Sequence, residues 1–334
     1  MRRTAWRSRC RRVGVCAATA IGVLTAVAAS PATAAVSDDR CLRPDAAGDT
    51  TVDVRLAGTS HQVLAYVPKR IRRSSRPPLM LNLHGSSTNG LIQMQVSGMR
   101  AVAEAEGFVV AAPNGAIPVP PPPGDLHPGG SWAWNVPGVP PDPGTTARDD
   151  IRFLSRVVDA VSRTLCTDPS RTYATGFSGG GRMVSALGCE RADELAAIAP
   201  VAGLRAGRAD ADEPSVPDVE HCRPERPLPA LTFHGQQDPL NPYLGNGDLR
   251  WGYSVPVALQ TWARLDGCRR GPQSQPITGN VTRLAYTGCR DDVTVELYRI
   301  ADGSHTWPGA TEPDGGQEID AARIMWEFFE RYRR

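Results

Sequence analysis

Apolar and polar positions alternate along residues 51–57 and again along residues 62–67. This is the pattern of β-strands with one buried face. The polar stretch 58–61 separates the two segments, so an antiparallel hairpin is expected. Residues 79–83, in contrast, form a continuous apolar run, which indicates a strand buried on both faces.

Segments of helical and strand character alternate after this point. Such alternation predicts an α/β protein whose sheet is mainly parallel and doubly wound, preceded by the antiparallel hairpin, in a single domain. Helices are expected near residues 99–106, 149–165 and 319–334, and strands near residues 108–112, 171–175, 229–235 and 293–300.

Residues 117–144 break this pattern because they contain four consecutive prolines, at positions 120–123. Such proline density excludes a helix or a central strand and predicts a long loop. Trp132 and Trp134 follow the prolines and could form a wall of a substrate cleft or simply pack. Trp307, after the last predicted strand, is a third candidate for substrate contact.

The first 34 residues carry six arginines, no acidic residue, and an apolar run that ends in small residues. This composition predicts a cleaved secretory signal peptide over residues 1–34 and a mature domain over residues 35–334, with a membrane anchor as the less favoured reading. Loss of the leader changes the formal net charge from +2 to −4. We therefore expect a secreted, extracellular protein that binds neither nucleic acid nor membrane, and a monomer.

Eight cysteines become six once the leader is removed, and an even number in an exported protein suggests disulfide bonds. Six cysteines allow 15 pairings. Cys268 and Cys289 form the best pair because they flank a segment shaped like a hairpin, and Cys189–Cys222 and Cys41–Cys166 would follow by elimination. No C-x-x-C or H-x-x-x-H spacing occurs, so neither a metal site nor another cofactor is expected.

Residues 176–180, Gly-Phe-Ser-Gly-Gly, carry the candidate chemistry. The pattern G-x-S-x-G is short, but here a predicted strand precedes it and a predicted helix follows, as in the turn that exposes a nucleophilic serine. Glycines at positions 176 and 179 would allow such a sharp turn. Ser178 is therefore the predicted nucleophile, with the backbone N–H groups of Gly179 and Ser86 as predicted oxyanion donors.

A serine nucleophile needs a base and an acid that orients the base. Asp238 follows a predicted strand, where the loops of a parallel sheet gather catalytic groups, and His305 lies in a loop rich in glycine and proline after the last strand. Five other residues compete for these roles or for substrate contact. We expect His84 and His234 to shape loops, Asp149 and Asp150 to cap a helix, and Arg182 to form a structural ion pair or contact an acidic substrate group.

Several longer motifs accompany these residues. They are the segments 83–85 (LHG), 149–153 (DDIRF), 171–183 (RTYATGFSGGGRM), 196–203 (AAIAPVAG), 234–243 (HGQQDPLNPY) and 305–309 (HTWPG). Together they resemble the secreted poly(3-hydroxybutyrate) depolymerase and feruloyl esterase family over nearly all of the mature chain. The resemblance implies an α/β-hydrolase fold, carboxylic ester hydrolysis, and a catalytic triad of Ser178, Asp238 and His305.

The chain departs from the family pattern at Ser304, where a glycine is usual, and at Ser86-Ser87. The favoured function is hydrolysis of feruloyl or acetyl esters of plant polysaccharide through an acyl-enzyme, and polyester depolymerisation is the alternative. Depolymerases of the family often carry an extra domain that adsorbs to the polymer, whereas this chain ends soon after its last predicted helix. A non-catalytic binding protein and a peptidase on the same fold are more remote alternatives.

Overall fold

The structure, a computed structural model, describes residues 47–71, 75–120, 128–139, 147–309 and 318–334. These residues belong to one unit, Arg40–Arg334. The predicted signal peptide, residues 1–34, lies outside the described residues.

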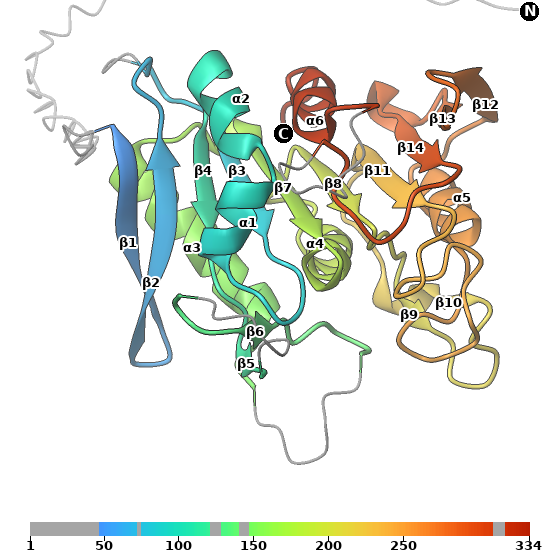
Figure 1. Ribbon diagram of the computed structural model, residues 1–334, viewed down its shortest axis with the longest axis horizontal. Coiled ribbons are helices and arrows are strands. Elements are labelled where there is room, and N and C mark those ends of the chain that lie inside the picture. Colours follow the sequence, from blue (N-terminus) through green and yellow to red (C-terminus); the bar gives the residue numbers. More distant parts are fainter. Residues whose placement is uncertain (1–46, 72–74, 121–127, 140–146, 310–317) are drawn as a thin grey trace, which may run out of the picture. The chain divides into compact units, whose positions relative to one another are not determined.

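A ten-stranded sheet runs through the unit in the order β1-β2-β4-β3-β7-β8-β11-β14-β13-β12 (Figure 1). Its central strands, from β4 to β14 in this order, pair in parallel, whereas the strands at both edges pair antiparallel. The predicted α/β class with an N-terminal antiparallel hairpin is therefore confirmed. The strands of this sheet are β1 (Gly48–Leu56), β2 (Thr59–Val67), β3 (Leu79–Leu83), β4 (Val109–Ala112), β7 (Thr172–Phe177), β8 (Ala197–Val201), β11 (Ala230–Gly235), β12 (Arg270–Pro276), β13 (Val281–Thr287) and β14 (Val295–Ile300).

Helices cover both faces of the sheet, and two separate apolar clusters fill the space between them. One cluster joins one face to α3, α4 and α5, and the other joins the opposite face to α1, α2 and α6. Within β3, Leu79, Leu81 and Leu83 belong to the first cluster and Met80 to the second, so the continuous apolar run serves both faces, as predicted. The helices are α1 (Gly90–Val96), α2 (Met99–Glu106), α3 (Asp150–Leu165), α4 (Gly179–Glu190), α5 (Val255–Leu265) and α6 (Ala321–Phe329).

The loop predicted at residues 117–144 contains a small ladder that sequence patterning did not indicate. Strands β5 (Ile117–Pro118) and β6 (Trp132–Ala133) pair antiparallel below the main sheet in Figure 1. A second small ladder joins β9 (Arg208–Ala209) and β10 (Pro217–Asp218). Short 3₁₀ helices occupy Pro169–Arg171, Val219–His221 and Arg290–Asp292.

Two disulfides lie within the described chain, Cys189–Cys222 and Cys268–Cys289. The second links the two ends of the β12–β13 hairpin region, so the predicted pair is confirmed, and the first agrees with the pairing reached by elimination. Cys166 is also disulfide-bonded, but its expected partner Cys41 lies outside the described residues. That pairing stays a prediction.

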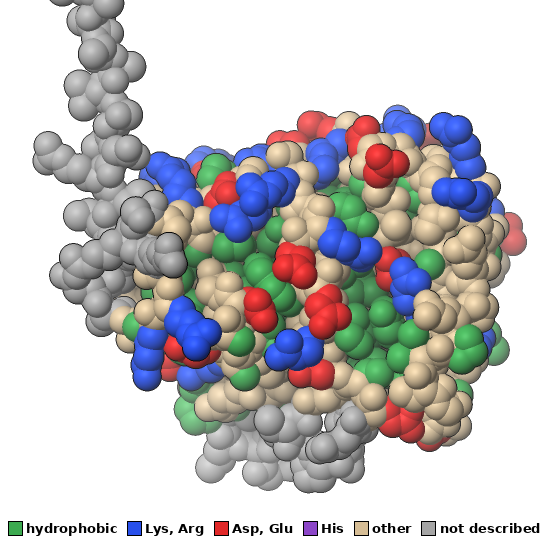
Figure 2. Space-filling view, turned by 90° about the horizontal axis from the view of Figure 1, so that it is seen from above, with side chains coloured by type: hydrophobic (Ala, Val, Ile, Leu, Met, Phe, Trp, Pro, Cys, Tyr) green, Lys and Arg blue, Asp and Glu red, His purple; other side chains and the backbone are tan. Residues whose placement is uncertain are grey.

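Charged side chains of both signs are interspersed on the face of the molecule that Figure 2 shows. A continuous basic surface, which nucleic-acid binding would require, is not visible among the described residues of this face. In the described part of the chain, no helix has the length and apolar character needed to cross a bilayer.

Candidate active site

Ser178 stands at the turn between β7 and α4, at the position predicted for the nucleophile. Its backbone has φ +52° and ψ −113°, a conformation that is strained for a residue with a side chain. Two hydrogen bonds hold the turn, from Ser178 N–H to the Val201 carbonyl at 2.9 Å and from Arg182 N–H to the Ser178 carbonyl at 2.9 Å. Strain of this kind persists only where the surrounding structure enforces it and is common at active sites.

The loop after β3 lies directly against this turn. A Cβ atom added at Gly179 would lie 2.4 Å from Ser86 Oγ and 3.3 Å from Ser86 N, and one added at Gly85 would lie 3.6 Å from Ser178 Cβ. The two predicted oxyanion donors, Gly179 N–H and Ser86 N–H, therefore belong to backbone segments in close contact beside Ser178. A side chain at position 179 would force Ser86 to shift from this approach.

Asp238 and His305, separated by 67 residues in sequence, are joined by a hydrogen bond of 2.7 Å between Asp238 Oδ2 and His305 Nδ1. Asp238 follows β11, and its other oxygen, Oδ1, accepts from the backbone N–H groups of Leu240 at 2.9 Å and Asn241 at 2.8 Å. The carboxylate is buried, whereas the imidazole of His305 retains some exposure. Such a pair fixes the tautomer of the imidazole and leaves Nε2 for a reaction partner.

Burial alone would raise the pKa of Asp238. Hydrogen bonds from His305 and from Asn241 N–H, together with the nearby imidazoles of His305 and His234, outweigh burial and hold the pKa of this carboxyl below its ordinary value. Asp238 is therefore ionised at neutral pH, as an orienting acid must be.

The imidazole of His305 lies beside Phe177, with the two ring centres 4.8 Å apart. Phe177 directly precedes Ser178, so His305 is placed next to the nucleophile turn. Among the described residues, no hydrogen bond joins Ser178 Oγ to His305. Catalytic hydrogen bonds of hydrolases are often long in the free enzyme and tighten in the complex with substrate.

His84 and His234, the competing histidines, are both buried and serve the backbone. His84 Nε2 accepts from Gly115 N–H at 3.0 Å, which leaves Nδ1 to donate to the Gly85 carbonyl at 2.6 Å. His234 Nε2 lies 2.8 Å from the Asn241 carbonyl. Burial lowers the pKa of each to about 4, so both are neutral at pH 7 and shape loops, as predicted.

The three tryptophans proposed to contact substrate have different surroundings. Trp132 is half-buried, and its backbone exchanges hydrogen bonds with Ser87 and Thr88, next to the predicted oxyanion loop. Trp134 is only 4% exposed, and its indole N–H donates to the His84 carbonyl at 2.8 Å. Trp307 is 3% exposed within one of the two apolar clusters. Burial of Trp134 and Trp307 does not fit a substrate-contacting surface, and only Trp132 has a suitable position.

Asp149 takes the predicted role of helix cap, whereas Asp150 does not. Asp149 caps α3 by accepting from Arg152 N–H at 3.0 Å. Asp150 is buried, pairs with Arg148 at 2.7 Å, and accepts from the backbone of Ala116 and Asn135. It therefore connects loops rather than capping a helix. The structural ion pair expected for Arg182 does not occur among the described residues.

Asn241 has a part in the site that sequence reasoning missed. Besides donating its backbone N–H to Asp238, it donates from its side-chain amide to the Ala202 carbonyl at 2.5 Å and accepts at its own carbonyl from His234. It thereby ties the loop of the acid to the residue after β8. The signals in the sequence were its position three residues after Asp238 and its place in the 234–243 motif.

The chain is similar to several known esterases. No family model matches the chain. Feruloyl esterase B of Piromyces equi is 30% identical over 281 residues, covering 81% of this chain and 45% of that protein. Feruloyl esterase C of Emericella nidulans is 30% identical over 186 residues, covering 55% of this chain and 58% of that protein. The chain thus spans about half the length of these curated relatives.

Among solved structures, an acetyl xylan esterase from Aspergillus awamori superimposes with a TM-score of 0.54 at 15% identity, covering 80% of this chain and 93% of the other. The sheet order and the strained serine turn define an α/β-hydrolase. Within that class, the chain is similar in sequence to feruloyl esterases and other esterases.

Proposed function

We propose that this protein is a secreted serine esterase that hydrolyses feruloyl or acetyl esters of plant cell-wall polysaccharide through an acyl-enzyme. The observation that carries the proposal is the 2.7 Å hydrogen bond between Asp238 and His305 beside the strained turn of Ser178. A nucleophile, an orienting acid and a base in this chain order are typical of α/β-hydrolases.

In the first half of the reaction, His305 Nε2 takes the proton of Ser178 Oγ as the serine attacks the ester carbonyl. Asp238 accepts from Nδ1–H and stabilises the imidazolium that forms. The tetrahedral intermediate collapses to the acyl-enzyme as the imidazolium returns the proton to the departing alcohol.

In the second half, His305 takes a proton from the water that attacks the acyl carbon. The imidazolium returns this proton to Ser178 Oγ as the bond to the acyl carbon breaks and the acid is released. The backbone N–H groups of Gly179 and Ser86 bind the negative oxygen in both tetrahedral intermediates. Removing one donor of this kind typically reduces the rate about 10²-fold or more.

The choice of substrate rests on the relatives, two of which are feruloyl esterases. Export to an oxidising compartment is supported by the disulfides Cys189–Cys222 and Cys268–Cys289, which rarely persist in a reducing cytosol. Extracellular polysaccharide would be accessible to such an enzyme.

Polyester depolymerisation is the second candidate, and one surface feature favours it. The loop after Asp238 exposes Leu240, Leu244 and Leu249, with 68%, 78% and 41% of each residue accessible. Exposed leucines near an active site provide an apolar surface on which a hydrophobic polymer can lie.

Initial rates on methyl ferulate, on acetylated xylan and on short 3-hydroxybutyrate oligomers distinguish these functions. We expect turnover of at least one of the first two, and loss of that turnover in Ser178→Ala while the melting temperature stays the same. Turnover of the oligomers alone would make the polyester function the correct one. A purified mature chain inert toward p-nitrophenyl acetate and p-nitrophenyl butyrate would instead indicate a non-catalytic binding protein.

A further inference from the structure

A cavity of about 380 Å³ lies along one side of α4, apart from the predicted triad. Arg182, Ala186 and Glu190 line it, and they recur every four residues, so they share one face of the helix. Val136 and Val139 provide an apolar part of the wall. The volume is within the range of small-molecule sites.

Arg205 lines the cavity and is only 6% exposed. Its Nη2 donates to the Arg250 carbonyl at 2.5 Å, and its guanidinium lies 4.8 Å from the ring centres of both Trp251 and Tyr253. Its Nη1, however, is buried without a hydrogen-bond partner. A buried charged donor left unpaired is costly, so a ligand atom that accepts from it would be favourable.

Arg182 adds a second guanidinium to the same cavity, and its Nε is also buried without a partner. Burial, with repulsion from Arg205 and Arg250, lowers the pKa of Arg182 to about 10, so it remains charged at neutral pH. Neither Arg182 nor Arg205 forms an ion pair with a described carboxylate.

The acidic side chains that line the cavity have other neighbours. Glu220 pairs with Arg223 at 3.6 Å. Burial and the nearby charge of Asp149 raise the pKa of Glu190, and the cations that oppose this shift are Arg191 and His221. Glu225 also lines the cavity, and burial lowers the pKa of Arg205 while the charge of Asp248 acts to raise it, but among the described residues no carboxylate forms an ion pair with either arginine. The two arginines therefore form a positive end of the cavity.

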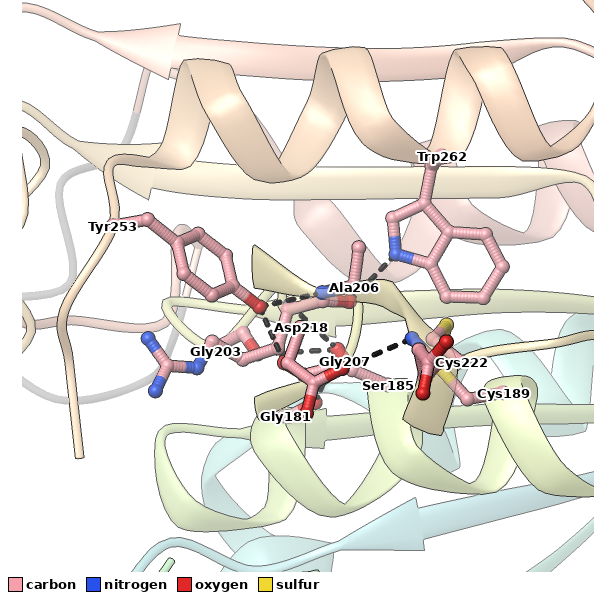
Figure 3. The surroundings of a disulfide bond; sticks show 12 residues. Gly181, Ser185, Cys189, Gly203, Ala206, Gly207, Asp218, Cys222, Tyr253 and Trp262 are labelled. Atoms are coloured by element: carbon pink, nitrogen blue, oxygen red, sulfur yellow. Dashed lines mark hydrogen bonds between the residues drawn. A yellow bond between two sulfur atoms is a disulfide. The ribbon is translucent and has the colours of Figure 1, made fainter. Parts of the chain in front are cut away.

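Several hydrogen bonds hold the loop that carries Arg205, and Figure 3 shows them near the Cys189–Cys222 disulfide. The Tyr253 hydroxyl accepts from Ala206 N–H at 2.9 Å and donates to the Gly207 carbonyl at 2.5 Å. The indole of Trp262 donates to the Arg205 carbonyl at 2.6 Å. Because the loop is already ordered, an anion could bind without the entropic cost of ordering it.

We propose that this cavity binds a carboxylate carried by the substrate itself, such as that of an acidic sugar in the polysaccharide that bears the ester. The proposal rests on the proposed esterase function. Guanidinium groups bind carboxylates through paired hydrogen bonds. Arg182 follows Ser178 by four residues, about 6 Å along the helix axis, so a ligand in the cavity lies beside the segment that presents the nucleophile.

Isothermal titration of the mature protein at low ionic strength and pH 7 tests the site independently of hydrolysis. Galacturonate and galactose are matched probes, since they differ only in the carboxylate. We expect galacturonate to bind and galactose not to bind. Arg182→Gln should weaken binding of galacturonate at least tenfold. Arg156→Gln, at an exposed arginine outside the cavity, is the matched control and should change it by less than about twofold.

Ala186→Glu provides a second variant in case Arg182→Gln impairs folding. It places a carboxylate one helical turn from Arg182, and it should abolish binding without lowering the melting temperature. Equal heats for galacturonate and galactose would overturn the proposal. So would binding of inorganic phosphate as tight as that of galacturonate, because the site would then select a free anion.

Hydrolysis of p-nitrophenyl acetate, measured beside these titrations, separates the two proposals. Wild-type protein that binds galacturonate but does not hydrolyse this ester would contradict the esterase function, and with it the substrate origin of the carboxylate. Wild-type protein that hydrolyses the ester but does not bind galacturonate would contradict the carboxylate site alone.

Discussion

Ser178 illustrates how a single residue is held in a conformation that its side chain disfavours. Its positive φ is enforced by the hydrogen bond from its N–H to Val201 and by the packing of the following glycines. The same turn brings Gly179 against Ser86, so the strain and the predicted oxyanion donors have one structural origin.

Asp238→Asn is the sharpest test of the predicted triad at the scale of one residue. An asparagine amide can donate to His305 Nδ1, which would fix the wrong tautomer, and kcat should fall by about 10⁴, as in serine proteases. Steady-state kinetics on p-nitrophenyl acetate measures this. Asp212→Asn, at an exposed aspartate, controls for loss of one charge. Near-normal kcat in Asp238→Asn would mean that the orienting acid is elsewhere.

At the scale of elements, the start of α4 packs directly on the end of β3. A Cβ atom at Gly180 would lie 2.4 Å from the carbonyl oxygens of both Leu83 and His84. No side chain could move aside to relieve this contact, because the atoms belong to the backbone. The glycine run after Ser178 is therefore required by the approach of a helix to a strand.

We accordingly expect Gly180→Ala to destabilise the protein by about 1–3 kcal/mol or more, since backbone must shift to admit the methyl group. A thermal melt followed by circular dichroism should show a decrease of several degrees. Gly279→Ala is the matched control, because a Cβ atom there would meet nothing within 4 Å. Equal melting temperatures for the two variants would contradict this account of α4.

At the scale of the whole molecule, a buried carboxyl should make stability depend on pH. Asp266, after α5, accepts from Leu228 N–H at 3.0 Å and is fully buried. Burial raises its pKa to about 7, although that hydrogen bond and the charges of Arg290 and Arg226 oppose the shift. Between about pH 4 and pH 7 the folded protein retains a proton that the unfolded chain releases, so the free energy of unfolding should fall as pH rises through this range.

Asp266→Asn removes this titration. We expect the variant to melt at a higher temperature than the wild type at pH 8, and the difference to shrink or reverse at pH 4. Melting curves across this range measure the effect, with Asp212→Asn as the surface control. If the variant loses stability with rising pH as steeply as the wild type, then groups other than Asp266 cause the pH dependence of stability.

Local patterns in the sequence were sufficient to predict much of the fold. Alternation predicted the hairpin of β1 and β2, and a continuous apolar run predicted β3, because burial on one or two faces of a sheet dictates which positions are apolar. Patterning did not indicate β8, which is short and contains Pro200, or α1, which has only seven residues. Tertiary contacts stabilise these elements where local preference is weak.

The amino-acid sequence by itself determined the class of fold, the Cys268–Cys289 pair and the residues of the predicted triad. These predictions depend on residues that are close together in the chain and on the order in which the motifs follow one another. Only the tertiary structure decided that Trp134 and Trp307 are buried, that Asn241 supports the acid, and that Arg182 and Arg205 line one cavity without an ion pair to a carboxylate in the described part of the chain. The burial of a side chain and its hydrogen-bond or ion-pair partners depend on which distant segments meet in space, and the spacing of residues along the chain does not specify this.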